Sequence, residues 1–244
     1  MYSNIAKSFN PPLRNPYYFI RRELLKKISF YAPQLSGKLL DFGCGEKPYK
    51  SLFNNATEYI GLDFENEGHS HKNEQIDFFY DGKKIPFNDE SFDSVFASEV
   101  FEHIFNLHEI LPELNRVLKL KGKMLITCPF VWNEHEIPHD YARYTRFALK
   151  DLLEKSGFEI IKIDKSGDFS MTLHQMKMVY LSEHILQAIP IIGKIKFISS
   201  NIRPIVIFLK NGYFLLKHKI MPKRYDFYLN NIILVAKVKN YNAL

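Results

Sequence analysis

LLDFGCGEKPYKSLF, residues 39–53, is the stretch of the sequence that decides the fold. An apolar run ends on Asp41, and a turn with two glycines, Gly43-Cys44-Gly45, follows at once. A short apolar run before such a turn predicts a buried strand. Glycine lets the backbone bend sharply and approach a neighbour closely, so the end of this strand is expected to pass near a ligand.

Apolar and amphipathic segments alternate along the rest of the chain. Strands are expected at 38–42, 58–64, 76–81, 91–100, 122–130, 158–164 and 231–239, and helices at 16–32, 107–118 and 146–156. Thr145 is expected to cap the last of these helices and Gly157 to end it. Apolar strands that alternate with helices predict an α/β fold with a mostly parallel sheet.

Length and composition suggest one sizeable core. The chain has 244 residues, 46% of them hydrophobic, which is enough for one core with a small appendage. The expected divisions are an N-terminal helical cap (1–36), a core (37–165), an apolar and basic helical insertion (166–230), and a last core strand with its tail (231–244). The two cysteines have no metal-type spacing, so a reducing, cytoplasmic location is expected.

The positive charge is concentrated in the insertion. The net charge is +6, and residues 166–224 carry nine Lys or Arg against two Asp or Glu. The basicity therefore belongs to one segment, which argues against a nucleic-acid partner and predicts a local basic surface.

Three successive expected strands end in Asp41, Asp63 and Asp81. The carboxyl ends of parallel strands share one edge of a sheet, where ligands bind, so three carboxylates are expected along that edge. The third glycine of a pyrophosphate loop is missing, and Glu46 stands where a phosphate would lie. These acids suit a ligand that carries an amine or another cation, and Asp63 suits a ribose diol.

Three stretches, at 39–49 (LLDFGCGEKPY), 59–64 (YIGLDF) and 80–104 (YDGKKIPFNDESFDSVFASEVFEHI), resemble in order and spacing the motifs of class I S-adenosylmethionine-dependent methyltransferases. The resemblance covers about residues 37–164 and the last strand. It implies a Rossmann-like, seven-stranded, mostly parallel sheet with helices on both faces and an antiparallel last strand, with the helical insertion between strands six and seven. It also implies S-adenosylmethionine as the cofactor.

The resemblance assigns cofactor contacts by motif match. The glycine turn would pass under the methionine part, Asp63 would hold the ribose with Phe64 against adenine, and Asp81 would meet the adenine amine. The matched positions are Asp41, Gly43, Cys44, Gly45, Asp63, Phe64, Asp81, Gly82, Ser98 and Glu99.

Two further features narrow the resemblance to a subset of bacterial, type 11-like methyltransferases. The glycine turn reads GCGEKPY instead of G-x-G-x-G, and residues 139–145 read HDYARYT. Many members of that subset are linked to cell-surface sugars or lipids, which implies O-methylation of a saccharide or a lipid-linked intermediate. Two alternatives remain: a small hydrophobic, quinone-like acceptor, or a non-catalytic nucleotide-binding protein of the same fold.

The loop after the fifth strand, CPFVWNEHEIPHDYARYT (128–145), carries the expected acceptor site. His139 is the first candidate for a general base, and His103 is the second. The residues expected to contact substrate are His135, Asp140, Tyr141, Arg143 and Tyr144. The alternative is that Asp140, Arg143 and Thr145 only fix the loop and start the next helix, and that His103 only stabilises a helix start.

No metal site is expected. His69 and His71 share a polar loop without a supporting cluster, and His135 and His139 would need a helix that Pro138 disfavours.

The insertion mixes apolar clusters with lysines. Pro190, Gly193, Pro204 and Gly212 are expected to divide it into about three short helices. Two arrangements fit this composition. Residues 170–224 either lie on an anionic membrane surface, at its inner face, or form a lid or a homodimer interface.

Overall fold

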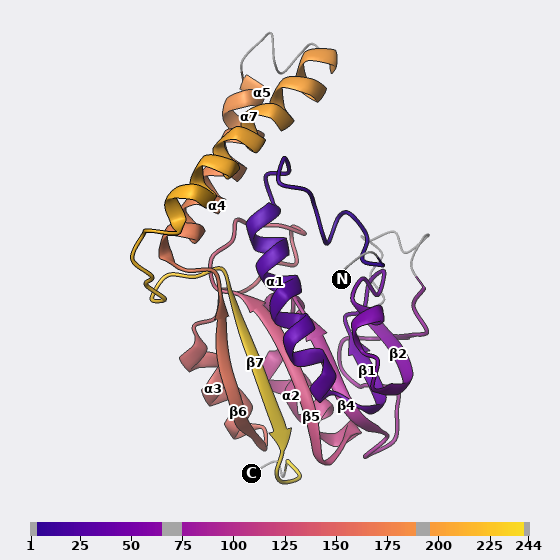
Figure 1. Ribbon diagram of the computed structural model, residues 1–244. Helices are drawn as coiled ribbons and strands as arrows, with labels where there is room; N and C mark the ends of the chain where they lie inside the picture. The colour runs from indigo at the N-terminus through magenta and orange to yellow at the C-terminus, as the bar shows by residue number, and fades with distance from the viewer. Residues whose placement is uncertain (1–3, 65–74, 189–195, 242–244) are drawn as a thin grey trace. The chain divides into compact units, whose positions relative to one another are not determined.

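Seven strands form one sheet in the order β3-β2-β1-β4-β5-β7-β6 (Figure 1). The strands are β1 (Gly37–Phe42), β2 (Ala56–Phe64), β3 (Phe78–Tyr80), β4 (Phe92–Ser98), β5 (Leu118–Pro129), β6 (Phe158–Ser166) and β7 (Asn230–Lys237). The pairs β2–β3, β1–β2, β1–β4 and β4–β5 are parallel, and β5–β7 is antiparallel. The predicted Rossmann-like, mostly parallel sheet with an antiparallel last strand is confirmed.

The computed structural model describes residues 4–64, 75–188 and 196–241. The chain divides into two compact units. The first combines Met1–Lys26 with Lys165–Leu229, and the second combines Lys27–Asp164 with Asn230–Leu244. The second unit holds most of the sheet and all of the residues that the sequence predicts for the site.

Strand register brings the predicted ligand edge together. Leu40 of β1 lies between Ile60 of β2 and Val95 of β4, so the apolar run of β1 is covered by neighbours on both sides. Farther along, Phe42 pairs with Leu62 and Leu62 with Phe78, so β1, β2 and β3 end close to one level. The loops that follow these strands therefore meet at one edge.

Helices flank the sheet on both faces (Figure 1). α2 (Leu107–Val117) and α3 (Arg146–Lys155) cover one face, and residues 27–31 of α1 (Tyr18–Tyr31) lie against the other. Lys27 at the end of α1 forms an ion pair of 2.6 Å with Asp164 of β6. The buried side of α2 is mostly apolar and consists of Leu107, Ile110, Leu111, Leu114 and Val117. Asn115 is buried as well, and its amide donates to the Lys239 carbonyl.

The predicted end signals of α3 are confirmed. The side-chain oxygen of Thr145 accepts a hydrogen bond from the Ala148 N–H, which satisfies a donor that the first helical turn leaves unpaired. Gly157 follows the helix with a φ of 85°, the left-handed conformation that commonly ends a helix.

The chain between β1 and β2 contains a single 3-10 turn, Lys50–Leu52, because β2 begins only four residues later and leaves no room for an α-helix. One expected strand boundary differs from the structure. β5 begins at Leu118 instead of Gly122, because Leu118 pairs with Phe92 at the start of β4.

The other unit is a helical hairpin joined to the N-terminal segment (Figure 1). It contains α4 (Phe169–Tyr180), a π-helical turn (Leu181–Ile185), α5 (Leu186–Ala188) and α7 (Lys196–His218). Phe214 of α7 stacks on His174 of α4 with ring centroids 4.1 Å apart, and Phe19 meets both rings edge-on. None of the described helices combines the length and the apolarity needed to cross a membrane.

The expected division of the insertion at Pro204 and Gly212 is wrong, because both residues lie inside α7. A proline costs about 3 kcal/mol and a glycine about 1 kcal/mol in a helix interior. Burial of Ile207, Asn211 and Phe214 on one side of α7 offsets that cost. Pro190 and Gly193 lie outside the described residues.

Candidate functional site

The glycine turn folds back onto the end of β2. The backbone N–H groups of Gly43 and Cys44 both donate to the Leu62 carbonyl, at 2.8 and 3.2 Å. Gly43 has a φ of 70°, and a Cβ there would lie 2.3 Å from Cγ2 of Val100. At Gly45 (φ 45°) no described heavy atom lies within 4 Å of a Cβ position. The turn is therefore packed on its Gly43 side and open at Gly45, where a ligand can approach the backbone.

Asp63 is tied to this turn. Its Oδ2 accepts a hydrogen bond of 2.7 Å from the Gly45 N–H, and its Oδ1 accepts one of 2.7 Å from the Phe64 N–H. Each carboxylate oxygen has two lone pairs, so both can still accept from a pair of hydroxyls. The structure brings together the turn and the acid that the resemblance pairs with a ribose.

Phe64 and Gly82 lie side by side at the ends of β2 and β3. The Phe64 ring is 40% exposed, and its Cε2 lies 2.8 Å from the position of a Cβ on Gly82. Gly82 has a φ of 79°, so the turn after β3 requires glycine for both its conformation and the ring beside it. A half-exposed aromatic ring next to Asp63 offers an apolar face for a planar base.

Asp41 is buried below the turn. Its Oδ2 accepts a hydrogen bond of 2.6 Å from the Tyr59 hydroxyl. Burial raises the pKa of Asp41 to about 7, against the opposing effect of that hydrogen bond. A bound cation nearby would favour the ionised carboxylate, so the electrostatics of this position suit a positively charged ligand group.

Asp81 caps its own turn. Its Oδ1 accepts hydrogen bonds from the backbone N–H groups of Lys83 and Lys84, at 2.9 and 3.0 Å, and these bonds lower its pKa. The turn-capping role of this acid is thus observed, and its contact with an adenine amine stays a prediction.

Lys47 is a buried residue that the sequence did not single out. Its Nζ lies 2.6 Å from Oδ2 of Asp77, which also accepts a hydrogen bond from the Gly61 N–H. A Cβ on Gly61 would lie 2.2 Å from Cε of Lys47. A glycine inside a strand marks a close approach, so Gly61 was the available signal for this ion pair.

Glu99, at the end of β4, is held by hydrogen bonds from two neighbouring strands. Thr127 of β5 donates to its Oε1 at 2.8 Å, and Asn230 of β7 donates to its Oε2 at 2.6 Å. Ser98 shares a 2.9 Å hydrogen bond with the same threonine hydroxyl. Glu99 has a φ of 56°, so its backbone is strained where the chain leaves the sheet. The predicted pair Ser98 and Glu99 therefore forms a fixed polar end of β4.

Arg143 and Asp140 clamp the loop after β5. The guanidinium donates to both carboxylate oxygens, at 2.6 and 2.7 Å, and also to the carbonyls of Trp132, Asn133 and Ala142. Burial alone would raise the pKa of Asp140, but Arg143 and a backbone N–H lower it to about 2. Since Nε, Nη1 and Nη2 each donate within the loop, the geometry favours the loop-fixing alternative for this pair.

The predicted aromatic and histidine residues near this loop lie in different surroundings. His139 bonds through Nδ1 to the Tyr141 hydroxyl at 3.0 Å, and Tyr141 is 45% exposed. Tyr144 packs against the core, and burial raises its pKa. The rings of His103 and His135 lie edge-on, with centroids 4.7 Å apart. The structure therefore brings His103 and His135 together.

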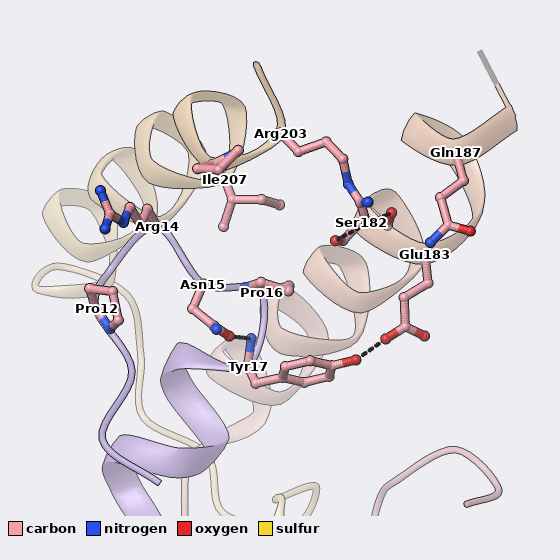
Figure 2. A pocket seen from close by; sticks show the side chains of 11 residues that line it. Pro12, Arg14, Asn15, Pro16, Tyr17, Ser182, Glu183, Gln187, Arg203 and Ile207 are labelled. Atoms are coloured by element: carbon pink, nitrogen blue, oxygen red, sulfur yellow. Dashed lines mark hydrogen bonds between the residues drawn. The ribbon is translucent and has the colours of Figure 1, made fainter. Parts of the chain in front are cut away.

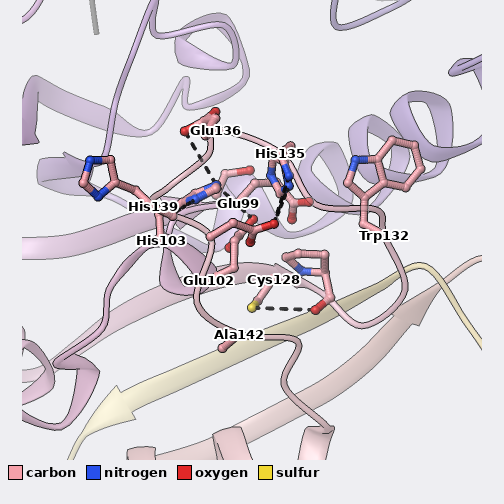
Figure 3. A network of polar contacts seen from close by, with 12 residues as sticks. Glu99, Glu102, His103, Cys128, Trp132, His135, Glu136, His139 and Ala142 are labelled. Carbon is pink, nitrogen blue, oxygen red and sulfur yellow. Dashed lines mark hydrogen bonds and ion pairs between the residues drawn. The ribbon is translucent and has the colours of Figure 1, made fainter. Parts of the chain in front are cut away.

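Glu102 joins His103 and His135, as Figure 3 shows. Its side chain is fully buried, and its backbone carbonyl accepts hydrogen bonds from the N–H groups of Tyr141 and Ala142. Burial and the nearby charge of Glu99 raise the pKa of Glu102 well above the usual range. The sequence indicated His103 as a candidate base, but it placed neither Glu102 nor His135 beside that residue.

The helical unit contains a separate pocket of about 580 Å³ (Figure 2). The Tyr17 hydroxyl donates to the Glu183 carboxylate, and Arg203 donates to the Ser182 carbonyl at 2.7 Å. Burial, together with the bond to Glu183, raises the pKa of Tyr17 to about 12. Ile207 supplies an apolar part of the wall. No sequence motif predicted this pocket, because its residues come from three distant segments.

Comparison with known proteins locates a domain in the sheet unit. Residues 40–126 match the family described as "Methyltransferase domain". The chain is also 26% identical, over 166 residues, to the uncharacterized protein MJ1252 of Methanocaldococcus jannaschii. That alignment covers 66% of this chain and 63% of the relative, so the chain spans less than two thirds of the curated relative that it matches.

Two solved structures share the fold. A SAM-dependent methyltransferase from Archaeoglobus fulgidus superposes with a TM-score of 0.55 and 18% identity, over 95% of this chain and 97% of that one. The [4+2]-cyclase SpnF superposes with a TM-score of 0.54 and 19% identity, over 86% of this chain and 80% of that one. At this identity the likeness shows the fold alone.

Proposed function

We propose that this protein transfers the methyl group of S-adenosylmethionine to an acceptor. The observation that carries the proposal is the glycine turn, open at Gly45 and hydrogen-bonded to Asp63, at the carboxyl edge of the sheet. The match of residues 40–126 to a methyltransferase domain supports it. The cofactor supplies the methyl group as an electrophile, and the protein must hold it, align the acceptor and exclude water.

The residues of the edge fit such a cofactor. Asp63 can accept from the two ribose hydroxyls, and the exposed face of Phe64 can stack on the base. The buried Asp41 can favour a cationic methionine end, and the backbone at Gly45 leaves room for it.

We further propose an oxygen acceptor on a saccharide or a lipid-linked intermediate. The loop after β5 is rigidly held by the Asp140–Arg143 clamp and presents His139 and Tyr141 beside one another. Such a polar, hydrogen-bonding surface suits a hydroxyl-rich acceptor. A quinone-like acceptor is the alternative, and a fold that binds the cofactor without transfer is a second. Mass spectrometry of small metabolites and glycolipids, with and without the gene, separates these possibilities. A compound that carries an added methyl group only when the gene is present identifies the acceptor.

The first prediction concerns cofactor binding by the unmodified protein. We expect S-adenosylhomocysteine to bind with one site per chain and to raise the unfolding temperature, because a ligand that binds only the folded state stabilises it. Isothermal titration calorimetry and thermal unfolding measure this. ATP, which shares the adenosine but carries phosphates, should bind far more weakly because Asp41 and Asp63 repel it. Binding of ATP but not of S-adenosylhomocysteine would reject the proposed function.

We propose an anionic membrane surface as the partner of the helical unit, which would place a cytoplasmic protein at the inner face of the membrane. α7 exposes an apolar stripe at helical spacing, formed by Ile202, Ile205, Phe208, Leu209, Tyr213 and Leu216, and the exposed Ile220 follows the helix. Lys210 and Lys217 lie exposed on the same helix, and Lys219 follows it. Apolar side chains flanked by lysines suit the boundary between anionic headgroups and acyl chains.

The second prediction tests this partner. We expect the double variant Leu209→Glu/Leu216→Glu to bind anionic vesicles at least ~10-fold more weakly. Burial of two exposed leucines in the membrane would contribute roughly 3 kcal/mol to binding. Co-sedimentation with phosphatidylglycerol vesicles measures the bound fraction. Phe147→Glu, on α3 and 67% exposed, is the matched control. The stripe is a homodimer interface instead if the wild-type protein does not bind vesicles, and if light scattering shows that it is a dimer and the double variant a monomer.

A further inference from the structure

Three side chains with metal-ligating atoms converge beside the end of β4 (Figure 3). Glu102 and His103 lie on the short helical turn Phe101–His103, and His135 comes from the loop after β5. One ligand atom from each of the three lies within 4.8 Å of the other two. Donor atoms around a tetrahedral Zn²⁺ lie roughly 3.3 Å apart, given bonds of about 2 Å, so small side-chain rotations would close the set around an ion.

The Glu102 carboxylate needs an explanation. It is fully buried, and neither of its oxygens has a hydrogen-bond partner among the described residues. The Cys128 thiol, whose pKa is raised by burial and by the nearby Glu102, makes a long contact of 4.0 Å with the Pro129 carbonyl. A buried carboxyl group without partners costs several kcal/mol, unless a cation lies against it. A metal ion would satisfy both oxygens at once.

The His103 ring is oriented as a metal ligand is. Its Nδ1 lies 2.6 Å from the backbone carbonyl of His139, so Nδ1 carries the hydrogen and Nε2 keeps its lone pair. Nε2 is buried without a hydrogen-bond partner in the described part of the chain. It lies 3.8 Å from Oε1 of Glu102 and 3.7 Å from Oε2 of Glu136. Ligating histidines characteristically donate their other N–H to a carbonyl or carboxylate in this way.

His135 is held by neighbours on its own loop. Its Nδ1 lies 3.2 Å from Oδ2 of Asp140, 3.3 Å from the Asn133 carbonyl and 3.3 Å from Nη2 of Arg143. The two oxygens favour a hydrogen on Nδ1, whereas the guanidinium N–H would donate to a lone pair there, so these contacts position the ring without fixing its tautomer. Asp140 is itself fixed by Arg143. The clamp that holds the loop therefore also orients this imidazole toward His103 and Glu102.

We propose that Glu102, His103 and His135 bind one divalent transition-metal ion, such as Zn²⁺ or Mn²⁺. Two imidazole nitrogens and one carboxylate form a donor set that suits these ions better than Mg²⁺, which prefers oxygen. Glu136, 61% exposed and close to His103, can supply a further oxygen. The sequence predicted no metal here, because it paired His135 with His139 and could not place it beside Glu102.

Three protein ligands leave coordination positions open. One further step rests on the proposed methyltransferase function. An oxygen of the acceptor would occupy such an open position, so the ion would select hydroxyl acceptors near the carboxyl edge of the sheet, where the cofactor is proposed to bind. The metal site itself stands on Glu102, His103 and His135 alone. Its failure and the failure of cofactor binding are therefore separate results.

The test uses untagged full-length protein, first stripped with a chelator and then titrated calorimetrically with ZnCl₂, MnCl₂ and MgCl₂. We expect one equivalent of Zn²⁺ or Mn²⁺ to bind and Mg²⁺ to bind much more weakly. His103→Ala and His135→Ala should each weaken binding by at least ~100-fold, since even residues that only support a ligand cost 10–100-fold when removed. Glu102→Gln, which keeps the shape but removes the charge, should do the same.

His108→Ala is the matched control, because His108 is 71% exposed on α2 and should leave metal binding unchanged. Circular dichroism and thermal unfolding verify that each variant is folded, and His103→Asn and His135→Gln replace any variant that is not. The metal content of the protein as purified gives an independent reading. Absence of Zn²⁺ and Mn²⁺ binding at millimolar concentration, or binding that survives both histidine substitutions, would overturn the proposal and leave Glu102 as a buried neutral acid.

Discussion

Replacing Asp63 by alanine should lower the affinity for S-adenosylhomocysteine by at least ~100-fold. The carboxylate would accept from two ribose hydroxyls, and hydrogen bonds to a charged group contribute about 1.5–3 kcal/mol each. The substitution also removes the acceptor of the Gly45 N–H, which loosens the turn under the ligand. Isothermal titration calorimetry on the wild type and the variant measures the effect directly.

Asp81→Ala is the control for this experiment. Asp81 ends the next strand but is exposed, and its observed hydrogen bonds are to its own turn. If it also contacts the adenine amine, one hydrogen bond is lost and the affinity falls by about 10-fold. If it only caps the turn, the affinity stays at the wild-type value. Affinity of Asp63→Ala within threefold of the wild type, in a folded protein, would remove Asp63 from the cofactor site.

Features that depend on neighbouring residues could be read from the sequence. The apolar runs of β1, β2 and β4 identify buried strands, and the acid near the end of each of the first two falls at one edge because parallel strands end together. The helix cap at Thr145 follows from the same kind of local chemistry. In each case a few consecutive residues are enough to specify the conformation.

Features that depend on the path of a loop could not be read in this way. His135 lies 32 positions after His103, and only the course of the loop after β5 brings their rings together. The Lys47–Asp77 ion pair likewise joins residues 30 positions apart. Periodicity and spacing carry no information on such contacts, so the sequence placed His135 with His139, its near neighbour in the chain.

In the insertion, the prediction from local sequence was wrong, because it divided one helix at Pro204 and Gly212. Pro204 and Gly212 are strong helix breakers on average, yet both lie within α7. The helix buries Asn211, whose amide donates to the Leu13 carbonyl at 2.7 Å, and Phe214, which stacks on His174. Tertiary contacts on that side of α7 outweigh the propensity of two residues, and propensity alone contains no term for them.

The two glycines of the opening turn should respond differently to alanine, because only one of them is packed. Gly43→Ala must hold a φ of 70° and place a Cβ 2.3 Å from Cγ2 of Val100. The left-handed conformation costs roughly 1–2 kcal/mol and the overpacking a further ~1–3 kcal/mol. We expect the free energy of unfolding, measured by urea denaturation, to fall by about 3 kcal/mol. Gly45→Ala, with open space around its Cβ, should lose only about 1 kcal/mol.

Gly45→Ala, which costs the less stability of the two substitutions, should weaken cofactor binding more. The Cβ of Gly45→Ala would occupy the open side of the turn, so S-adenosylhomocysteine should bind at least ~10-fold more weakly to a protein of nearly full stability. Val100→Ala supplies the internal check: combined with Gly43→Ala it removes the methyl groups that clash and should restore part of the lost stability, a coupling that a double-mutant cycle measures. Equal loss of stability at both glycines, or no coupling to Val100, would mean that the turn is not packed against Val100. Backbone conformation alone would then determine the shape of the glycine turn.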